Sequence, residues 1–80
     1  MESKIIELTV RRFLEGSFPL VKHVGNDSLL LGSGLLDSLA VLEVVGFVER
    51  EFHITVLDED LIPENFGTIK SIAAFVSRKA

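Results

Sequence analysis

Apolar residues recur at helical spacing in three segments of the 80-residue chain, and this periodicity limits the fold more than any other feature of the sequence. The first segment spans about residues 3–15, the second begins at Asp37, and the last follows Thr68. Their apolar stripes are formed by Ile6, Val10, Phe13 and Leu14, by Leu42, Val45, Val48 and Phe52, and by Ile69, Ile72, Ala73 and Val76. Because such stripes are typical of amphipathic helices that pack on one another, the sequence predicts an all-α fold.

Residues with strong preferences for helix ends place the boundaries of these segments. The expected caps and stops are Ser3 and Gly16 for the first helix, Asp37 for the second and Thr68 for the last. Between the second and the last helix, Pro63 can open a single turn that Gly67 can close. The sequence therefore predicts a further, short helix there, the third of four.

A stretch of about twenty residues between the first two helices lacks a sustained period and is rich in turn residues. A connection of this length in a compact domain is either functional or a sign that its elements are misassigned, and we favour a functional one. The stretch also carries apolar residues that we expect to lie against the helices, namely Leu20, Val24, Leu29, Leu30, Leu31, Leu35 and Leu36. The expected fold is therefore a four-helix bundle with a long first loop and a short third helix.

Size and charge narrow the class of protein. Residues 1–80 have room for a single domain, which we expect to be complete, free-standing and monomeric. The first twenty residues lack the apolar centre of a secretory signal, and no apolar run approaches the length of a membrane span, so we expect a cytoplasmic protein. Twelve acidic residues against eight basic ones disfavour nucleic acid as a ligand and suit basic protein partners.

The residue types needed for catalysis or metal binding are absent or scattered. The chain contains no cysteine, so any thiol chemistry must come from an attached group. His23 and His53 are far apart in the sequence and lack accompanying ligands, so we predict no metal site. Asp37 stands beside Ser38 without a histidine to activate the hydroxyl. We therefore predict no catalytic residue and no enzyme activity.

The segment Gly34–Leu39 places Ser38 in the first turn of the second helix, directly after the long loop. A hydroxyl at a helix N-terminus is exposed, and the helix dipole favours a negative group attached to it. The segment resembles the Asp-Ser-Leu motif of acyl and peptidyl carrier proteins. Asn26–Leu30 and Glu64–Ile72 are similar to the loop and to the junction between the third and fourth helices of that family, in matching order and spacing.

The resemblance implies a bundle of the acyl-carrier type and a carrier function. It implies that a phosphopantetheinyl transferase attaches a 4'-phosphopantetheine arm from coenzyme A to Ser38, and that the arm holds intermediates as thioesters. The implied partners are an acyl or aminoacyl ligase or transferase that loads the arm, and downstream biosynthetic enzymes. Among the neighbouring residues, we expect Asp37 to be both helix cap and partner contact, and Leu39 and Glu43 to be partner contacts.

Three residues of the second helix, Ala40, Gly46 and Arg50, depart from the pattern of fatty-acid carriers. They favour specialised biosynthesis, of the polyketide or nonribosomal-peptide type or of lipids, over a housekeeping fatty-acid role. Two further acids of this helix, Glu49 and Glu51, are interpreted as solubility residues. If the bundle encloses the cargo, the expected neighbours of that cargo are Val41, Val44, Phe47 and Ile62.

The residues leave a competing interpretation open. In it, the chain is a small helical protein-interaction module without a prosthetic group, and Ser38 only caps a helix. Replacing Ser38 by alanine separates the two, because a module would keep part of its binding whereas a carrier would keep its fold and lose its function.

Overall fold

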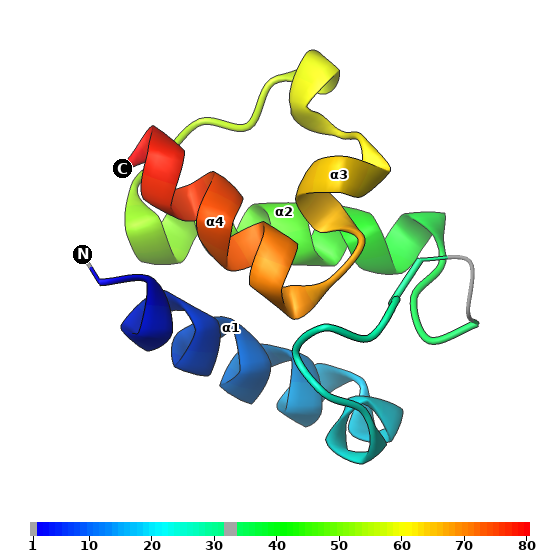
Figure 1. Cartoon of the computed structure of the whole chain (residues 1–80). Coiled ribbons are helices and arrows are strands. Elements are labelled where there is room, and N and C mark those ends of the chain that lie inside the picture. Colours follow the sequence, from blue (N-terminus) through cyan, green and yellow to red (C-terminus); the bar gives the residue numbers. More distant parts are fainter. Residues whose placement is uncertain (1, 32–33) are drawn as a thin grey trace.

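The computed structural model describes residues 2–31 and 34–80 and shows a helical protein (Figure 1). Its α-helices are α1 (Ser3–Ser17), α2 (Ser38–Phe52), α3 (Pro63–Phe66) and α4 (Ile69–Lys79). The connections before α2 and α3 contain the 3-10 helices η1 (Pro19–His23) and η2 (Asp58–Asp60). The described residues form no strand, only an isolated bridge between Leu31 and Leu36. The prediction of an all-α fold with a long first connection and a short third helix is confirmed.

None of the helices in the described part of the chain is long and apolar enough to cross a membrane.

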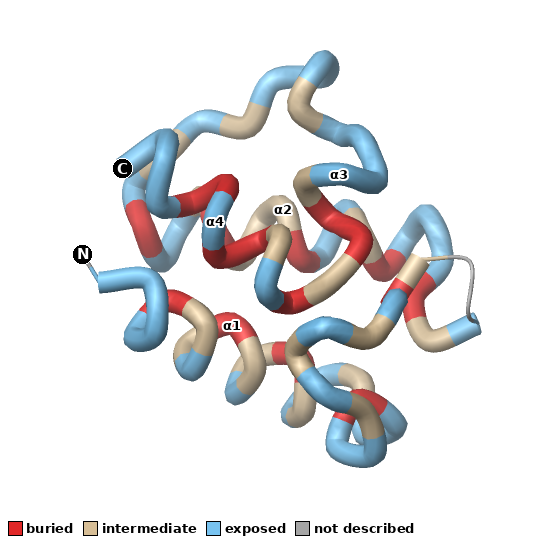
Figure 2. The backbone as a smooth tube through the Cα atoms, viewed as in Figure 1, coloured by how far each residue is buried: buried red, intermediate tan, exposed pale blue. Residues whose placement is uncertain are grey.

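The core lies between α1, α2 and α4, and Figure 2 shows buried residues recurring along one side of each. The buried residues of α1 are Ile6, Val10 and Leu14, and those of α4 are Ile69, Ile72, Ala73, Phe75 and Val76. The stripes predicted for these two helices are confirmed, except that Phe13 is only partly buried. Phe13 stacks on Phe47 of α2, with ring centroids 4.1 Å apart, and so joins α1 to α2.

The stripe predicted for α2 is wrong in part. The buried residues of α2 are Ala40, Val44, Val48 and Phe52. Leu42, which was expected in the stripe, is 58% exposed. Because α2 is apolar around most of its circumference, periodicity alone does not say which side faces the core. In the structure, α2 places Ala40 in the core and Leu42 at the surface.

Hydrogen bonds confirm three of the predicted helix ends. The Oδ1 of Asp37 accepts a hydrogen bond from the Ala40 N–H at 2.8 Å, which caps α2. The Oγ1 of Thr68 accepts from the Ser71 N–H at 2.9 Å and caps α4. Gly67 closes α3 through its N–H, which donates to the Pro63 carbonyl at 2.8 Å.

The first helix begins at residue 3 as predicted, but the residues predicted to cap and to stop it are wrong. Glu2 occupies the N-cap position without a side-chain hydrogen bond, and Ser3 is already helical. At the other end, α1 continues through Gly16 to Ser17, and the Phe18 N–H donates to the Leu14 carbonyl. Glycine often ends a helix by adopting the left-handed conformation, and Gly16 does not adopt it.

Polar contacts of Arg11 hold the first connection against α1. The guanidinium donates to the Asn26 Oδ1 at 2.7 Å and to the Val24 carbonyl at 2.6 Å. Asn26 in turn donates to the Glu7 carboxylate at 2.8 Å, and its carbonyl accepts from the Lys70 N–H at 3.0 Å. Asn26 therefore links the connection to both α1 and α4.

The apolar residues of this connection follow the prediction only in part. Leu30 and Leu36 are buried, and Val24, Leu31 and Leu35 pack partly against the core. Leu20 and Leu29 are exposed, so the prediction is wrong for these two residues. The connection is fixed by the polar contacts of Arg11 and by the buried leucines, and its position does not depend on burying the exposed pair. Gly32 and Ser33, in the same predicted loop, lie outside the described residues.

Candidate functional site

Ser38 is the first residue of α2, and it is exposed. The Asp37 side chain caps the Ala40 N–H, and the Asp37 carbonyl accepts from the Val41 N–H at 3.0 Å, which fixes the first turn of the helix. The positive end of the helix dipole therefore lies at the Ser38 hydroxyl. An anionic group attached to this oxygen is favoured electrostatically at this position.

An open groove of about 290 Å³ begins at Ser38 and runs between α2 and the segment that leads into α3. We call it the serine groove; its lining residues are Leu31, Ser38, Val41, Leu42, Leu61, Ile62, Pro63 and Phe66. Ser38 contributes the one polar side chain among these residues. An apolar group tethered near Ser38 can therefore be partly removed from water in this groove.

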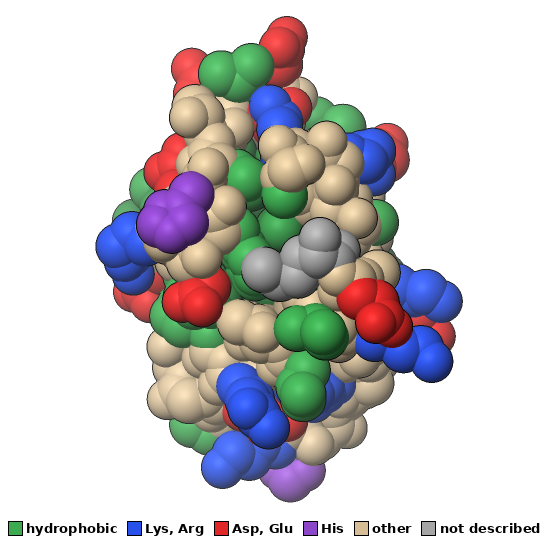
Figure 3. All heavy atoms as spheres, turned by 90° about the vertical axis from the view of Figure 1, so that its left-hand side faces the viewer, with side chains coloured by type: hydrophobic (Ala, Val, Ile, Leu, Met, Phe, Trp, Pro, Cys, Tyr) green, Lys and Arg blue, Asp and Glu red, His purple; other side chains and the backbone are tan. Residues whose placement is uncertain are grey.

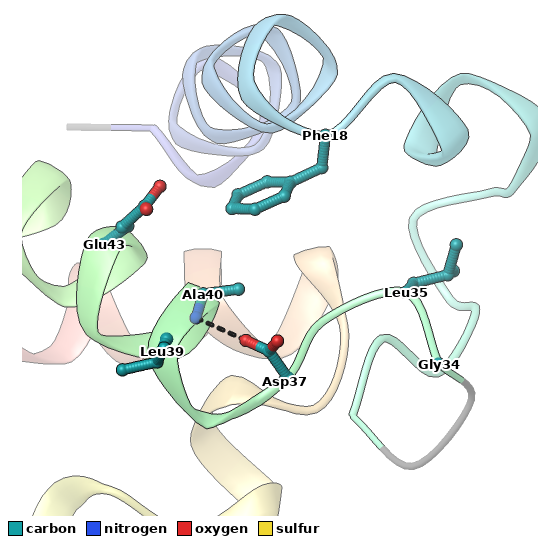
Figure 4. Close-up of a pocket in the computed structure, with 7 residues that line it drawn as sticks. All are labelled: Phe18, Gly34, Leu35, Asp37, Leu39, Ala40 and Glu43. Carbon is teal, nitrogen blue, oxygen red and sulfur yellow. Dashed lines mark hydrogen bonds between the residues drawn. The ribbon is translucent and has the colours of Figure 1, made fainter.

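A second hollow, of about 280 Å³, lies on another side of the start of α2 (Figure 4). We call it the Phe18 hollow; its lining residues are Phe18, Gly34, Leu35, Asp37, Leu39, Ala40 and Glu43. Figure 4 shows that the ring of Phe18, the residue that follows α1, points toward the start of α2 and lies between Glu43 and Leu35. The hollow thus combines an aromatic ring, aliphatic side chains and two carboxylates.

Helix geometry separates the two cavities. Leu39 and Glu43 are four residues apart and share one face of α2, whereas Ser38, Val41 and Leu42 share another. The two cavities have no lining residue in common. Groups attached at Ser38 and groups of a docking protein can therefore occupy different sides of the same helix.

The structure brings the predicted contact residues together. Asp37, Leu39 and Glu43 all line the Phe18 hollow and are all exposed, with Leu39 74% exposed despite its apolar side chain. Ser38 lies apart from them, in the serine groove. Sequence reasoning missed Phe18 as a wall of the hollow, because it follows the last turn of a helix and belongs to no periodic pattern.

Two of the four residues expected to neighbour an enclosed cargo lie at the serine groove. Val41 and Ile62 line the serine groove. Val44 is instead buried in the core, and Phe47 stacks on Phe13. The orientation of α2 turns Val44 toward the core, so it does not line the groove.

The interpretation of Glu49 as a solubility residue is wrong. Its carboxylate accepts a hydrogen bond from the Val56 N–H at 2.9 Å, and this bond fixes the start of the connection between α2 and α3. Glu51 is exposed, and no hydrogen bond or ion pair involves its side chain in the described part of the chain.

Charges are mixed over the end of the molecule remote from Ser38. Figure 3 shows this end, where the start of α1 meets the ends of α2 and α4, with basic and acidic side chains interspersed among hydrophobic ones. His23 and His53 are both exposed. Within residues 2–31 and 34–80, no group of His, Cys, Asp and Glu side chains could hold a metal ion.

The chain is similar to known acyl carrier proteins. No family model matches the chain. It is 28% identical over 78 residues to the probable acyl carrier protein PigG of a Serratia species, an alignment that covers 98% of this chain and 86% of that protein.

A solved structure gives closer agreement. The solution NMR structure of a holo acyl carrier protein from Nitrosomonas europaea superposes with a TM-score of 0.72 and 32% sequence identity. The match covers 91% of this chain and 92% of that one. The chain therefore belongs to the acyl carrier protein family, as the resemblance of its Asp-Ser-Leu segment implies, and its role is that of a carrier and not of an enzyme.

Proposed function

We propose that the protein, as a single domain spanning residues 1–80, carries acyl or aminoacyl groups as thioesters on a 4'-phosphopantetheine arm attached to the Oγ of Ser38. The observation that carries this proposal is the position of Ser38, which is exposed at the first turn of α2 and opens onto an apolar groove. The arm supplies the thiol that a chain without cysteine lacks. The groove and the residues around Ser38 hold the arm and present it to other proteins.

The residues around Ser38 fit the chemistry of such an arm. Its phosphodiester is negative, and the N-terminus of α2 favours a negative charge. The apolar walls of the serine groove suit the hydrocarbon part of a cargo, with Val41 on one side and Ile62 on the other. Asp37 keeps the first turn ordered through its cap, so the hydroxyl is presented in a fixed position.

The Phe18 hollow supports the proposed partner contacts. We propose that Asp37, Leu39 and Glu43, together with Phe18, bind the enzymes that modify, load and unload the carrier: a phosphopantetheinyl transferase, an acyl or aminoacyl ligase or transferase, and downstream biosynthetic enzymes. In the described part of the chain no ion pair involves the Glu43 carboxylate, which leaves it available to a basic partner residue. The exposed Leu39 supplies an apolar contact beside it.

The pathway belongs to the same proposal, and we favour specialised polyketide, nonribosomal-peptide-type or lipid biosynthesis. Of the three departures from fatty-acid carriers, Ala40 is explained by packing, because it is buried in the core. Gly46 has no such explanation, since a Cβ placed there would approach only the end of the flexible Arg50 side chain, at 3.3 Å. Gly46 and Arg50 are therefore the departures that support a specialised set of partners.

Intact-protein mass spectrometry tests the attachment of the arm. The protein is incubated with coenzyme A, magnesium and a broad-specificity phosphopantetheinyl transferase, alongside the variants Ser38→Ala and Ser77→Ala. Ser77 is the matched control, because it is also exposed on a helix but lies near the far end of α4. We expect one arm on the wild type and on Ser77→Ala, and none on Ser38→Ala. No gain on folded wild-type protein, with several transferases, would leave the interaction module without a prosthetic group as the better account.

A further inference from the structure

The outer wall of the serine groove is a separate piece of structure from α2. Ser38, Val41 and Leu42 form the α2 side, and the segment from Leu61 to Phe66 forms the opposite side. This outer wall packs on α4, where the Phe66 and Phe75 rings lie 5.3 Å apart between centroids. The width of the groove therefore depends on how firmly α4 holds the wall.

Burial along the wall shows where it is anchored. From Leu57 to Asn65 the chain is exposed at every residue except Asp60 and Asn65, which are partly buried. The three groove-lining residues between them, Leu61, Ile62 and Pro63, are all exposed, and none of them belongs to the core. The wall is thus fixed before Phe66 mainly through Asp60 and Asn65.

Both of these anchors are held by the last turn of α4. The Lys79 ammonium lies 2.9 Å from the Asp60 carboxylate, and the two side chains are only 30% and 17% exposed. The Arg78 guanidinium donates to the Asn65 Oδ1 at 2.9 Å. We call these four residues, Asp60, Asn65, Arg78 and Lys79, the α4 latch.

Further contacts join the latch into one network. The Asn65 side-chain amide donates to the Asp60 carbonyl at 2.9 Å, so the two anchors are also bonded to each other. The Leu57 N–H donates to the Asp60 carboxylate, and together with the nearby Lys79 and Arg78 charges it lowers the pKa of that carboxyl. Lys79 and Arg78 both lie over the Phe75 ring, at 5.8 and 5.9 Å from its centroid. The cations are therefore held in place on α4 while they hold the wall.

We infer that Lys79 and Arg78 are positioning residues that hold the outer wall of the serine groove and so set how well the groove shelters a cargo attached through Ser38. This inference rests on the carrier function proposed above. Neither residue touches the groove itself, and both act through Asp60 and Asn65. Loss of the latch leaves α1, α2 and the core unchanged and loosens the wall.

Amide hydrogen exchange on the full protein without an arm tests the latch directly. The variant Lys79→Met removes the cation, and Lys70→Met is the matched control on the same helix. Lys70 also pairs with an aspartate, Asp27, but at 3.7 Å and with side chains 68% and 83% exposed. We expect exchange at Leu61, Ile62 and Phe66 to become about fivefold faster in Lys79→Met and to stay unchanged in Lys70→Met.

A charge-conserving variant and the location of the faster exchange distinguish loss of the latch from general destabilisation. Lys79→Arg keeps the charge, so we expect exchange close to that of the wild type. Equal exchange in Lys79→Met and wild type would overturn the inference. Faster exchange that extends to the amides of α1 would overturn it as well, because it would show general destabilisation of the fold.

The effect on the cargo is measured on protein loaded with a hexanoyl arm from hexanoyl-coenzyme A. We expect hydroxylamine to cleave the thioester faster in Lys79→Met than in wild type or Lys70→Met. Equal lifetimes beside faster exchange would refute the role in sheltering the cargo. If the proposed carrier function is wrong, wild-type protein gains no arm. The exchange measurement remains valid in that case, because it is made on protein without an arm.

Discussion

Glu43 and Ser38 lie five positions apart on α2, yet they face different cavities. Glu43 shares the Phe18 hollow with Asp37, whose carboxylate also caps the helix. A docking enzyme can therefore contact acidic and apolar groups beside the serine without entering the groove where we expect the cargo to lie. Ser38 would thus present the arm on one side of α2, while Glu43 and Asp37 would contact a docking enzyme on another.

This division predicts the effect of reversing a single charge. We expect Glu43→Lys to lower kcat/KM for arm transfer by about tenfold, because the carboxylate faces a basic partner surface in the proposed complex. The matched control is Glu51→Lys, which makes the same change at another exposed position of α2. Transfer kinetics at low and high salt measure the effect, and the difference between the variants shrinks at high salt. Equal rates for the two variants would remove Glu43 from the contact surface.

The short α3 and its junction with α4 depend on one close backbone approach. A Cβ at Gly67 would lie 2.5 Å from the Pro63 carbonyl oxygen, the atom that accepts the Gly67 N–H. The Gly67 carbonyl also accepts from the Leu30 N–H at 2.7 Å, so a shift there disturbs the first connection as well. The glycine is needed here because of space and not because of a positive φ.

We therefore expect Gly67→Ala to destabilise the protein by about 1–3 kcal/mol. Gly16→Ala is the matched control, since a Cβ there meets nothing within 4 Å and alanine favours a helix by up to about 1 kcal/mol. Urea denaturation followed by circular dichroism measures both. A Gly67→Ala protein as stable as the wild type would show that the junction relaxes without cost.

Helix ends were predictable where a side chain makes the capping bond. Asp37 and Thr68 accept backbone hydrogen bonds as expected, because short polar side chains compete well for free N–H groups at helix starts. Ser3 and Gly16 were misread, because the same residue types are also tolerated inside a first or last turn. The 3-10 helices η1 and η2 carry no periodic signal, and the sequence did not predict them.

At the scale of the whole molecule, the sequence predicted the arrangement of helices better than the surface they leave exposed. The stripes of α1 and α4 were readable, since each has one apolar face, whereas α2 is apolar on several sides and its orientation depends on tertiary packing. The Asp-Ser-Leu segment identified Ser38 as the candidate attachment site, and Asp37 and Leu39 as candidate contacts. The groove wall and the α4 latch join residues far apart in the sequence, such as Asp60 and Lys79, and no local pattern indicates such pairs.

The proposed carrier role requires that Ser38 carries an arm that holds a thioester. The most direct measurement is tandem mass spectrometry of protein incubated with hexanoyl-coenzyme A and a broad-specificity phosphopantetheinyl transferase, before and after hydroxylamine treatment. We expect one hexanoyl arm per chain, loss of the hexanoyl group alone on treatment, and a phosphodiester located on Ser38. An arm on another residue, or folded protein that takes up none, would contradict it.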